Sequence, residues 1–136
     1  MIRCGIDTLE IQRMAEGIDR LGERFLNRFF TPAERQQCAD KPARLAARFA
    51  AKEAVGKALG TGIGDVSWKE IEILSDERRR PILHLHGNAA ALAAELGLVH
   101  WDVSLTHTDT LASAVAVAMG VPTVPTVPAP PAPPAE

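Results

Sequence analysis

The sequence RLAARFAAKEAVGKALGTGIG, residues 44–64, predicts a long helix that ends in a glycine-rich turn. Alanine, leucine, arginine, lysine and glutamate all favour a helix, and no proline interrupts the stretch. Leu45, Phe49, Gly56 and Leu59 fall on one side of the predicted helix, and six alanines cover most of the rest, so it lacks the broad polar face of an ordinary surface helix. We expect this helix to be central to the fold and packed on several sides.

Charged side chains also lie on this alanine-rich helix: Arg48, Lys52, Glu53 and Lys57. Charged groups in a packed setting cost free energy unless they are paired or bound to a ligand. Glu53 and Lys57 are four residues apart and share a face, where a plain ion pair would contribute roughly 0.2–0.5 kcal/mol. A functional site is the alternative interpretation, and it needs a second acidic residue elsewhere in the chain.

Asp7 is the candidate for that second acidic residue. It follows the apolar run 2–6, which predicts a short strand. Asp7-Thr8-Leu9-Glu10 also has the pattern of a capping box, which predicts that a helix begins here. Asp7 is then either an N-cap or a carboxylate that holds a metal and phosphates at a strand-to-helix junction. A carboxylate has enough lone pairs for both roles.

Hydrophobic periodicity and turn signals place the other elements. A helical pattern starts at residue 9 and continues to Phe30, with an expected break near Gly22. Thr31-Pro32-Ala33-Glu34 predicts the start of a further helix, which stops before Pro42. The remaining predicted elements are strands 71–73 and 82–85, a short helix 87–97, and strands 99–106 and 111–119. The predicted fold class is α+β, with N-terminal helices and the long central helix packed on a small antiparallel sheet.

Composition narrows the functional classes. The 136 residues suggest one domain, 1–120, and the proline-rich segment VPTVPTVPAPPAPPAE, residues 121–136, predicts an extended, disordered tail. A net charge of −2 argues against a general nucleic-acid binder, and no apolar run is long enough to cross a membrane. The two cysteines lack metal-ligand spacing, so a reducing cytoplasm is the simplest location.

Basic residues recur along the first helical segment at Arg13, Arg20, Arg24 and Arg28. They form one stripe if the helix is continuous. Glu16 and Glu23 lie close by, so the stripe is either a solvated face with local ion pairs or a docking surface for an acidic partner.

His107 follows the predicted strand 99–106, at a turn. It is either a polar turn residue or part of a site, because loops at strand ends often carry function. The other histidines, His84, His86 and His100, have no spacing typical of metal ligands.

Three separate segments resemble the signatures of the holo-acyl-carrier-protein synthase family. They are Gly5-Ile6-Asp7 with Glu10 and Arg13, the central residues 48–62, and Val103-Ser104-Leu105-Thr106-His107-Thr108. The resemblance covers residues 2–119 in the right order and spacing, and the proline-rich segment lies outside it.

The resemblance implies a phosphopantetheinyl transferase. Enzymes of this family move the phosphopantetheine arm of coenzyme A to a serine of an apo acyl carrier protein and release adenosine 3',5'-bisphosphate. It further implies a Mg²⁺ cofactor and a homotrimer with sites at subunit boundaries. Both fatty-acid and polyketide carrier proteins fit the sequence.

The resemblance also assigns residues. Asp7 and Glu53 would hold Mg²⁺, which is commonly bound by one or two carboxylates plus substrate phosphates. Glu53 would receive the serine proton, either directly or through a metal-bound water, and Lys57 would meet a phosphate or the departing oxygen. The expected contacts with coenzyme A are Arg48, Lys52, Thr106, His107 and Thr108, together with Gly60, Thr61 and Gly62, which could offer backbone amides to the ligand because glycine permits close approach. Because carrier proteins are acidic, Arg13, Arg20, Arg24 and Arg28 become the expected docking surface.

Two other classes of function remain open from sequence. A non-catalytic module that binds coenzyme A or a carrier domain would explain the basic residues and the glycine turn, but not two acidic positions beside Lys57. A metal-dependent phosphohydrolase is the more distant alternative.

Overall fold

The computed structural model describes residues 1–121 and 130–135. Its elements are β1 (Ile2–Glu10), α1 (Ile11–Leu21), α2 (Glu23–Phe29), α3 (Pro32–Cys38), α4 (Pro42–Leu59), the 3-10 turn η1 (Trp68–Glu70), β2 (Ile71–Ser75), β3 (Pro81–Leu85), α5 (Gly87–Glu95), β4 (Leu98–His107) and β5 (Leu111–Gly120). The α+β class is confirmed. The predicted disordered tail lies outside the described residues at 122–129 and 136. Within the described ranges no helix is long and apolar enough to cross a membrane.

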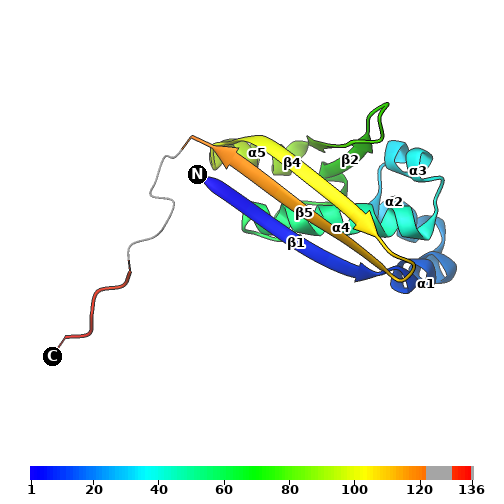
Figure 1. The fold of residues 1–136 in the computed structure, drawn as a ribbon, viewed down its shortest axis with the longest axis horizontal. Helices are drawn as coiled ribbons and strands as arrows, with labels where there is room; N and C mark the ends of the chain where they lie inside the picture. Colours follow the sequence, from blue (N-terminus) through cyan, green and yellow to red (C-terminus); the bar gives the residue numbers. More distant parts are fainter. Residues whose placement is uncertain (122–129, 136) are drawn as a thin grey trace.

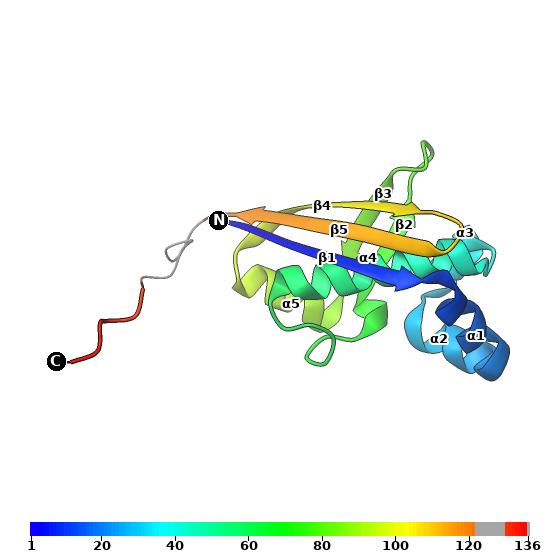
Figure 2. The same ribbon diagram turned by 60° about the horizontal axis from the view of Figure 1, so that its bottom comes forward.

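The strands form two antiparallel sheets. β1, β5 and β4 make a three-stranded sheet in the order β1-β5-β4, and β2 and β3 make a two-stranded sheet. Helix α4 runs beneath one face of the three-stranded sheet, while α1 and α2 lie at the end of the sheet opposite the N-terminus (Figure 1; Figure 2). The predicted packing of the central helix against an antiparallel sheet is therefore confirmed.

Small side chains bring α4 and the sheet close together. Successive strand residues point to opposite faces. On β5 the residues that face α4 are all alanines and are buried: Ala112, Ala114, Ala116 and Ala118. Alanines also cover much of α4, and its buried residues lie on several sides, as expected from its sequence. The opposite face of the sheet, which we call the outer face, carries the larger side chains of β5, Val115, Val117 and Met119.

Gly5 is a point of close contact between β1 and α4. A Cβ atom at this position would lie 1.9 Å from the carbonyl oxygen of Ala54 and 3.0 Å from Cβ of Lys57. Only glycine leaves room for this contact. Two residues further along the same face, Asp7 is thereby brought next to α4.

The capping predictions met different outcomes. Thr31 and Glu34 form the predicted capping box, with Thr31 Oγ1 accepting from the Glu34 amide at 3.2 Å and Glu34 Oε1 accepting from the Thr31 amide at 2.9 Å. Gly22, at φ +55°, breaks the first helical segment as expected. The prediction of an N-cap at Asp7 is wrong. Pairing of β1 with β5 continues to Glu10, so tertiary hydrogen bonding overrides the local signal and the helix begins at Ile11.

Replacing Gly5 by alanine tests the close contact. We expect Gly5→Ala to lower the free energy of unfolding by at least about 1–3 kcal/mol, the usual cost of overpacking, because backbone atoms of α4 must move. Gly64→Ala is the matched control, since no heavy atom of residues 1–121 or 130–135 lies within 4 Å of a Cβ built there. Denaturant unfolding of both variants provides the measurement, and equal stabilities would contradict the packing described for β1.

Candidate active site

Asp7, Glu53 and Lys57 meet at the edge of the sheet where β1 covers α4. The Lys57 ammonium lies 3.2 Å from Oδ1 of Asp7 and donates a 2.8 Å hydrogen bond to the carbonyl oxygen of Ile6. Glu53 lies one helical turn before Lys57 and is close enough for the charge of Asp7 to act on it. We call this group the carboxylate–lysine site.

The electrostatics of the site are set by two carboxylates and one ammonium. Burial, and secondly the negative charge of Asp7, raise the pKa of Glu53, while the positive charge of Lys57 acts in the opposite direction. A carboxyl group whose pKa is raised on folding costs stability once the pH exceeds its unfolded-state pKa. Perturbation of this kind by a specific charged neighbour is typical of functional sites.

The donor set fits a hard divalent cation. Within residues 1–121 and 130–135 no cluster of three or more histidine, cysteine, aspartate or glutamate side chains could hold a metal ion. A cation at the carboxylate–lysine site would therefore have two protein carboxylates and would need further oxygen ligands from water or substrate. That arrangement suits Mg²⁺, which keeps several waters and is bound through one or two carboxylates plus phosphates.

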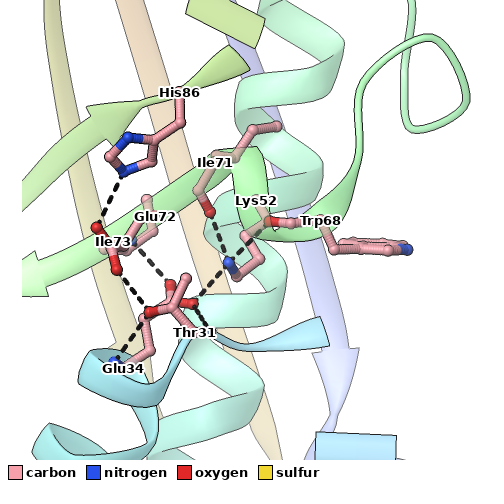
Figure 3. Close-up of polar contacts among 8 residues, drawn as sticks. All are labelled: Thr31, Glu34, Lys52, Trp68, Ile71, Glu72, Ile73 and His86. Atoms are coloured by element: carbon pink, nitrogen blue, oxygen red, sulfur yellow. Dashed lines mark hydrogen bonds and ion pairs between the residues drawn. The ribbon is translucent and has the colours of Figure 1, made fainter. Parts of the chain in front are cut away.

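Lys52 lies elsewhere, and the prediction that it contacts coenzyme A is wrong. Its side chain is 0% exposed. The ammonium donates to Glu34 Oε1 at 2.8 Å and to the carbonyl oxygens of Trp68 and Ile71 at 2.9 and 2.5 Å (Figure 3). Since an ammonium has three N–H donors, none remains for a ligand. Burial lowers the pKa of Lys52, and the neighbouring Glu34 opposes that shift.

The glycine turn differs from its prediction in one respect. Gly60 caps α4 with φ +85°, as the sequence indicates. However, the amides of both Gly60 and Gly62 donate to the carbonyl oxygen of Gly56 at 3.1 Å. They close the end of the helix and are not free to donate to coenzyme A, which contradicts the amide role predicted for them. Thr61 is exposed between them and keeps its predicted role as a proposal.

Arg48 faces a different side of α4. Five residues separate it from Glu53, which is roughly 140° around a helix. Its guanidinium donates to Ser75 Oγ at 2.8 Å, and its buried Nε has no hydrogen-bond partner among the residues that the structure describes. It lines a hollow of about 430 Å³ together with Gln37, Arg44, Ser75, Asp76 and Arg79. Sequence reasoning did not single out Arg44, because only folding brings the β2–β3 turn beside this part of α4.

The residues predicted at the end of β4 also lie apart from the carboxylate–lysine site. His107 is exposed and pairs with Ala112 of β5, which in turn pairs with Leu9 of β1. Two strand spacings, about 10 Å, therefore separate β4 from β1. Thr106 is exposed on β4, whereas the Thr108 hydroxyl accepts from the Leu111 amide at 3.1 Å and closes the turn. In the described ranges no hydrogen bond or ion pair joins Arg48 or His107 to the carboxylate–lysine site.

The predicted arginine stripe is interrupted but exposed. Arg13 and Arg20 lie on α1 and Arg24 and Arg28 on α2, on either side of Gly22, so they do not follow one continuous helix. None of the four takes part in an ion pair within the described part of the chain. Glu23, which the sequence offered as a partner for them, pairs with Arg35 at 2.7 Å instead. Beside Arg13 lies an apolar hollow of about 260 Å³, which is also lined by Leu9, Met14, Phe25, Phe29 and Phe49.

Comparison with known proteins identifies the family. Residues 3–117 match the family model described as the 4'-phosphopantetheinyl transferase superfamily. The chain belongs to this superfamily. It is 45% identical over 127 residues to the holo-[acyl-carrier-protein] synthase of Herpetosiphon aurantiacus, covering 88% of this chain and 100% of the relative. It is also 49% identical over 123 residues to the synthase of the same name from Solidesulfovibrio magneticus, with 88% and 100% covered.

Solved structures of other superfamily members share the fold. The Helicobacter pylori holo-[acyl-carrier-protein] synthase in complex with coenzyme A superposes with a TM-score of 0.79 at 33% identity, covering 88% of this chain and 100% of that one. The synthase of Neisseria meningitidis superposes with a TM-score of 0.80 at 31% identity, over 88% and 99% of the two chains. The family resemblance read from the three sequence segments is thus confirmed.

The shared electrostatics of the carboxylate–lysine site can be tested by titration without metal. Asp7→Asn removes a negative charge and should lower the pKa of Glu53, whereas Lys57→Met removes a positive charge and should raise it. Carbon-13 NMR of the Glu53 carboxyl group measures both shifts. If neither substitution moved the Glu53 pKa, the three side chains would not share one site.

Proposed function

We infer that this protein transfers the phosphopantetheine group of coenzyme A to a serine of an apo acyl carrier protein and releases adenosine 3',5'-bisphosphate. The observation that carries the inference is the convergence of Asp7, Glu53 and Lys57 in a chain of this superfamily. Relatives that are 45–49% identical over nearly their whole length are named for this activity.

The reaction replaces one phosphorus–oxygen bond by another. The serine oxygen forms a bond to the phosphorus that carries the pantetheine arm, and the pyrophosphate bond to the nucleotide breaks. Asp7 and Glu53 would hold Mg²⁺, which when bound supplies positive charge beside the pyrophosphate. Lys57 stabilises the negative charge that develops on the departing nucleotide oxygen, because it is a compact cation held beside Asp7.

Glu53 is the proposed acceptor of the serine proton, directly or through a water molecule. Burial and the charge of Asp7 raise its pKa, and a raised pKa makes a carboxylate a better base near neutral pH. Asp7 contributes in two ways: it provides a second carboxylate for the cation, and it holds the Lys57 ammonium in place.

The positions of Arg48 and His107 support assembly of the active site from more than one chain. Both are proposed to bind the nucleotide end of coenzyme A, with Thr61, Thr106 and Thr108 nearby, yet in a single chain they lie away from the carboxylate–lysine site. A second copy would bring these groups together, as in the homotrimer that the family resemblance implies. Arg44 and Arg79 add positive charge around Arg48 and fit a phosphate.

The outer face of the sheet supports self-association. Its exposed apolar side chains pair across the ladder, Ile6 with Val115 and Ile2 with Met119, and Val117 beside them is 41% exposed. A contiguous apolar surface of this kind marks an interaction site.

Sedimentation equilibrium tests the proposed homotrimer, and a monomer at micromolar concentration would contradict it.

Arg13, Arg20, Arg24 and Arg28 are the proposed docking surface for the carrier protein. They are exposed and free of ion pairs within the described residues, and the apolar hollow beside Arg13 offers a place for a nonpolar side chain. Acidic partners would be steered to this surface, so salt should weaken the encounter.

For location we propose the reducing cytoplasm, with which the two free cysteines agree.

Transfer is tested by intact mass. With Mg²⁺ and coenzyme A, an apo acyl carrier protein should gain the mass of one phosphopantetheine group. Glu53→Gln keeps the size of the side chain but removes its charge, and we expect it to lower kcat by on the order of 100–1,000-fold. Glu95→Gln makes the same change at an exposed residue at the end of α5, away from the proposed sites, and is a matched control that should leave kcat unchanged.

Coenzyme A binding and nucleotide release, measured beside the mass of the carrier, separate the alternatives. Binding of coenzyme A that needs no Mg²⁺, together with no mass gain on any carrier, would indicate a non-catalytic module. Release of nucleotide from coenzyme A without a carrier would indicate a phosphohydrolase. Full activity of Glu53→Gln would remove the proposed roles of Glu53 as base and metal ligand.

A further inference from the structure

The rotation of α4 about its own axis decides where Glu53 and Lys57 point. Side-chain ends lie about 5–6 Å from a helix axis, so a rotation of about 20° would move them by roughly 2 Å. Yet most of the buried side chains on α4 are alanines, found on several sides of the helix. Rows of identical small side chains pack at more than one rotation, because they lack the large knobs that lock one helix into a neighbour's grooves.

Lys52 supplies the directional contact that alanines lack. It is the residue directly before Glu53, and its buried ammonium has acceptors on three different elements. Glu34 belongs to α3, Trp68 to η1 and Ile71 begins β2, and Figure 3 shows the three acceptors converging on the ammonium. A shift of α4 in any direction would stretch at least one of these hydrogen bonds.

The acceptors themselves are held firmly. The Glu34 carboxylate accepts from the Thr31 amide on Oε1 and from the Ile73 amide on Oε2, both at 2.9 Å. Thr31 Oγ1 in turn donates to Glu72 Oε2 at 2.6 Å, and the other Glu72 oxygen contacts His86 Nε2 at 3.1 Å (Figure 3). The Glu34 carboxylate is therefore held by the N-cap of α3 and by β2, in addition to its contact with Lys52.

We propose that the buried Lys52–Glu34 pair is a positioning pair, which fixes the rotation of α4 and so places Glu53 and Lys57 opposite Asp7. The proposal rests on the function inferred above, since it explains how that site keeps its geometry. Buried ion pairs are weak contributors to net stability and are best attested as devices that specify register. A displacement of about 1 Å at a reacting group can cost on the order of 100-fold in rate.

The decisive variant is the double substitution Glu34→Gln/Lys52→Met. It removes both charges at nearly constant volume, so no unpaired charge is left buried. The new amide nitrogen faces a backbone N–H donor and the carbonyl oxygens of Trp68 and Ile71 lose their donor, so we expect a lower melting temperature. Measured well below the melting temperature, kcat at saturating coenzyme A and Mg²⁺ should fall by on the order of 100-fold, because the folded enzyme has lost the contact that sets α4. Glu34→Asp, which keeps the charge but shortens the acceptor, is the second variant if the double variant does not fold, and its kcat should also fall.

A structural readout distinguishes positioning from mere stability. Because a Cβ on Gly5 would lie 3.0 Å from Lys57 Cβ, a Gly5 α-proton should give a nuclear Overhauser effect to the Lys57 β-protons. We expect this signal to weaken in the double variant. The matched control is Arg35→Met, at the residue after Glu34, whose ion pairs with Glu23 and Asp40 at 2.7 and 2.9 Å reach α2 and the turn after α3. It should lower the melting temperature but leave kcat within twofold and the signal unchanged.

Two results would overturn the proposal. One is a folded double variant whose kcat stays within twofold of the wild type. The other is a loss of kcat with an undiminished Gly5–Lys57 signal, since α4 would then not have moved. If the wild-type protein transferred nothing, the inferred function would fail instead, and the Gly5–Lys57 signal would still show whether the pair sets α4.

Discussion

The backbone contact between β1 and α4 at Gly5 is the constraint on which the rest of the structure depends. Because a side chain there would collide with the Ala54 carbonyl oxygen, the strand can lie directly on the helix only if this residue is glycine. The contact places the carboxylate of Asp7, two residues further along the strand, beside the C-terminal half of α4. An acidic side chain from the start of the chain thus meets Glu53 and Lys57 without any loop to carry it.

Distance and rotation are set by different means. The glycine–alanine contacts allow β1 and β5 to approach α4 closely, but side chains this small oppose a rotation of α4 about its axis only weakly. The buried ammonium of Lys52 has acceptors on α3, η1 and β2. Burying this charge costs the free energy of removing its hydration water. The alanine contacts around α4 and the buried Lys52–Glu34 pair therefore combine close packing with a defined orientation.

Local signals in the sequence predicted much of this architecture. The capping box at Thr31, the break at Gly22 and the cap at Gly60 depend only on neighbouring residues, and all three appear where the sequence places them. Nonlocal contacts were harder to predict. Asp7 looks like a helix cap until β5 pairs with its strand, and Lys52 looks like a ligand-binding residue until α3 and β2 enclose it. Burial is decided by what packs alongside, which a single stretch of sequence does not record.

The central claim is that Asp7 and Glu53 share one divalent cation. Paramagnetic Mn²⁺, added with coenzyme A in place of Mg²⁺, tests it most directly by NMR without requiring turnover. The structure predicts that signals of residues around positions 7 and 53 broaden first, and that Asp7→Asn abolishes this broadening at the same Mn²⁺ concentration. Broadening centred elsewhere, for example on the exposed acidic turn at Asp76 and Glu77, would contradict the claim.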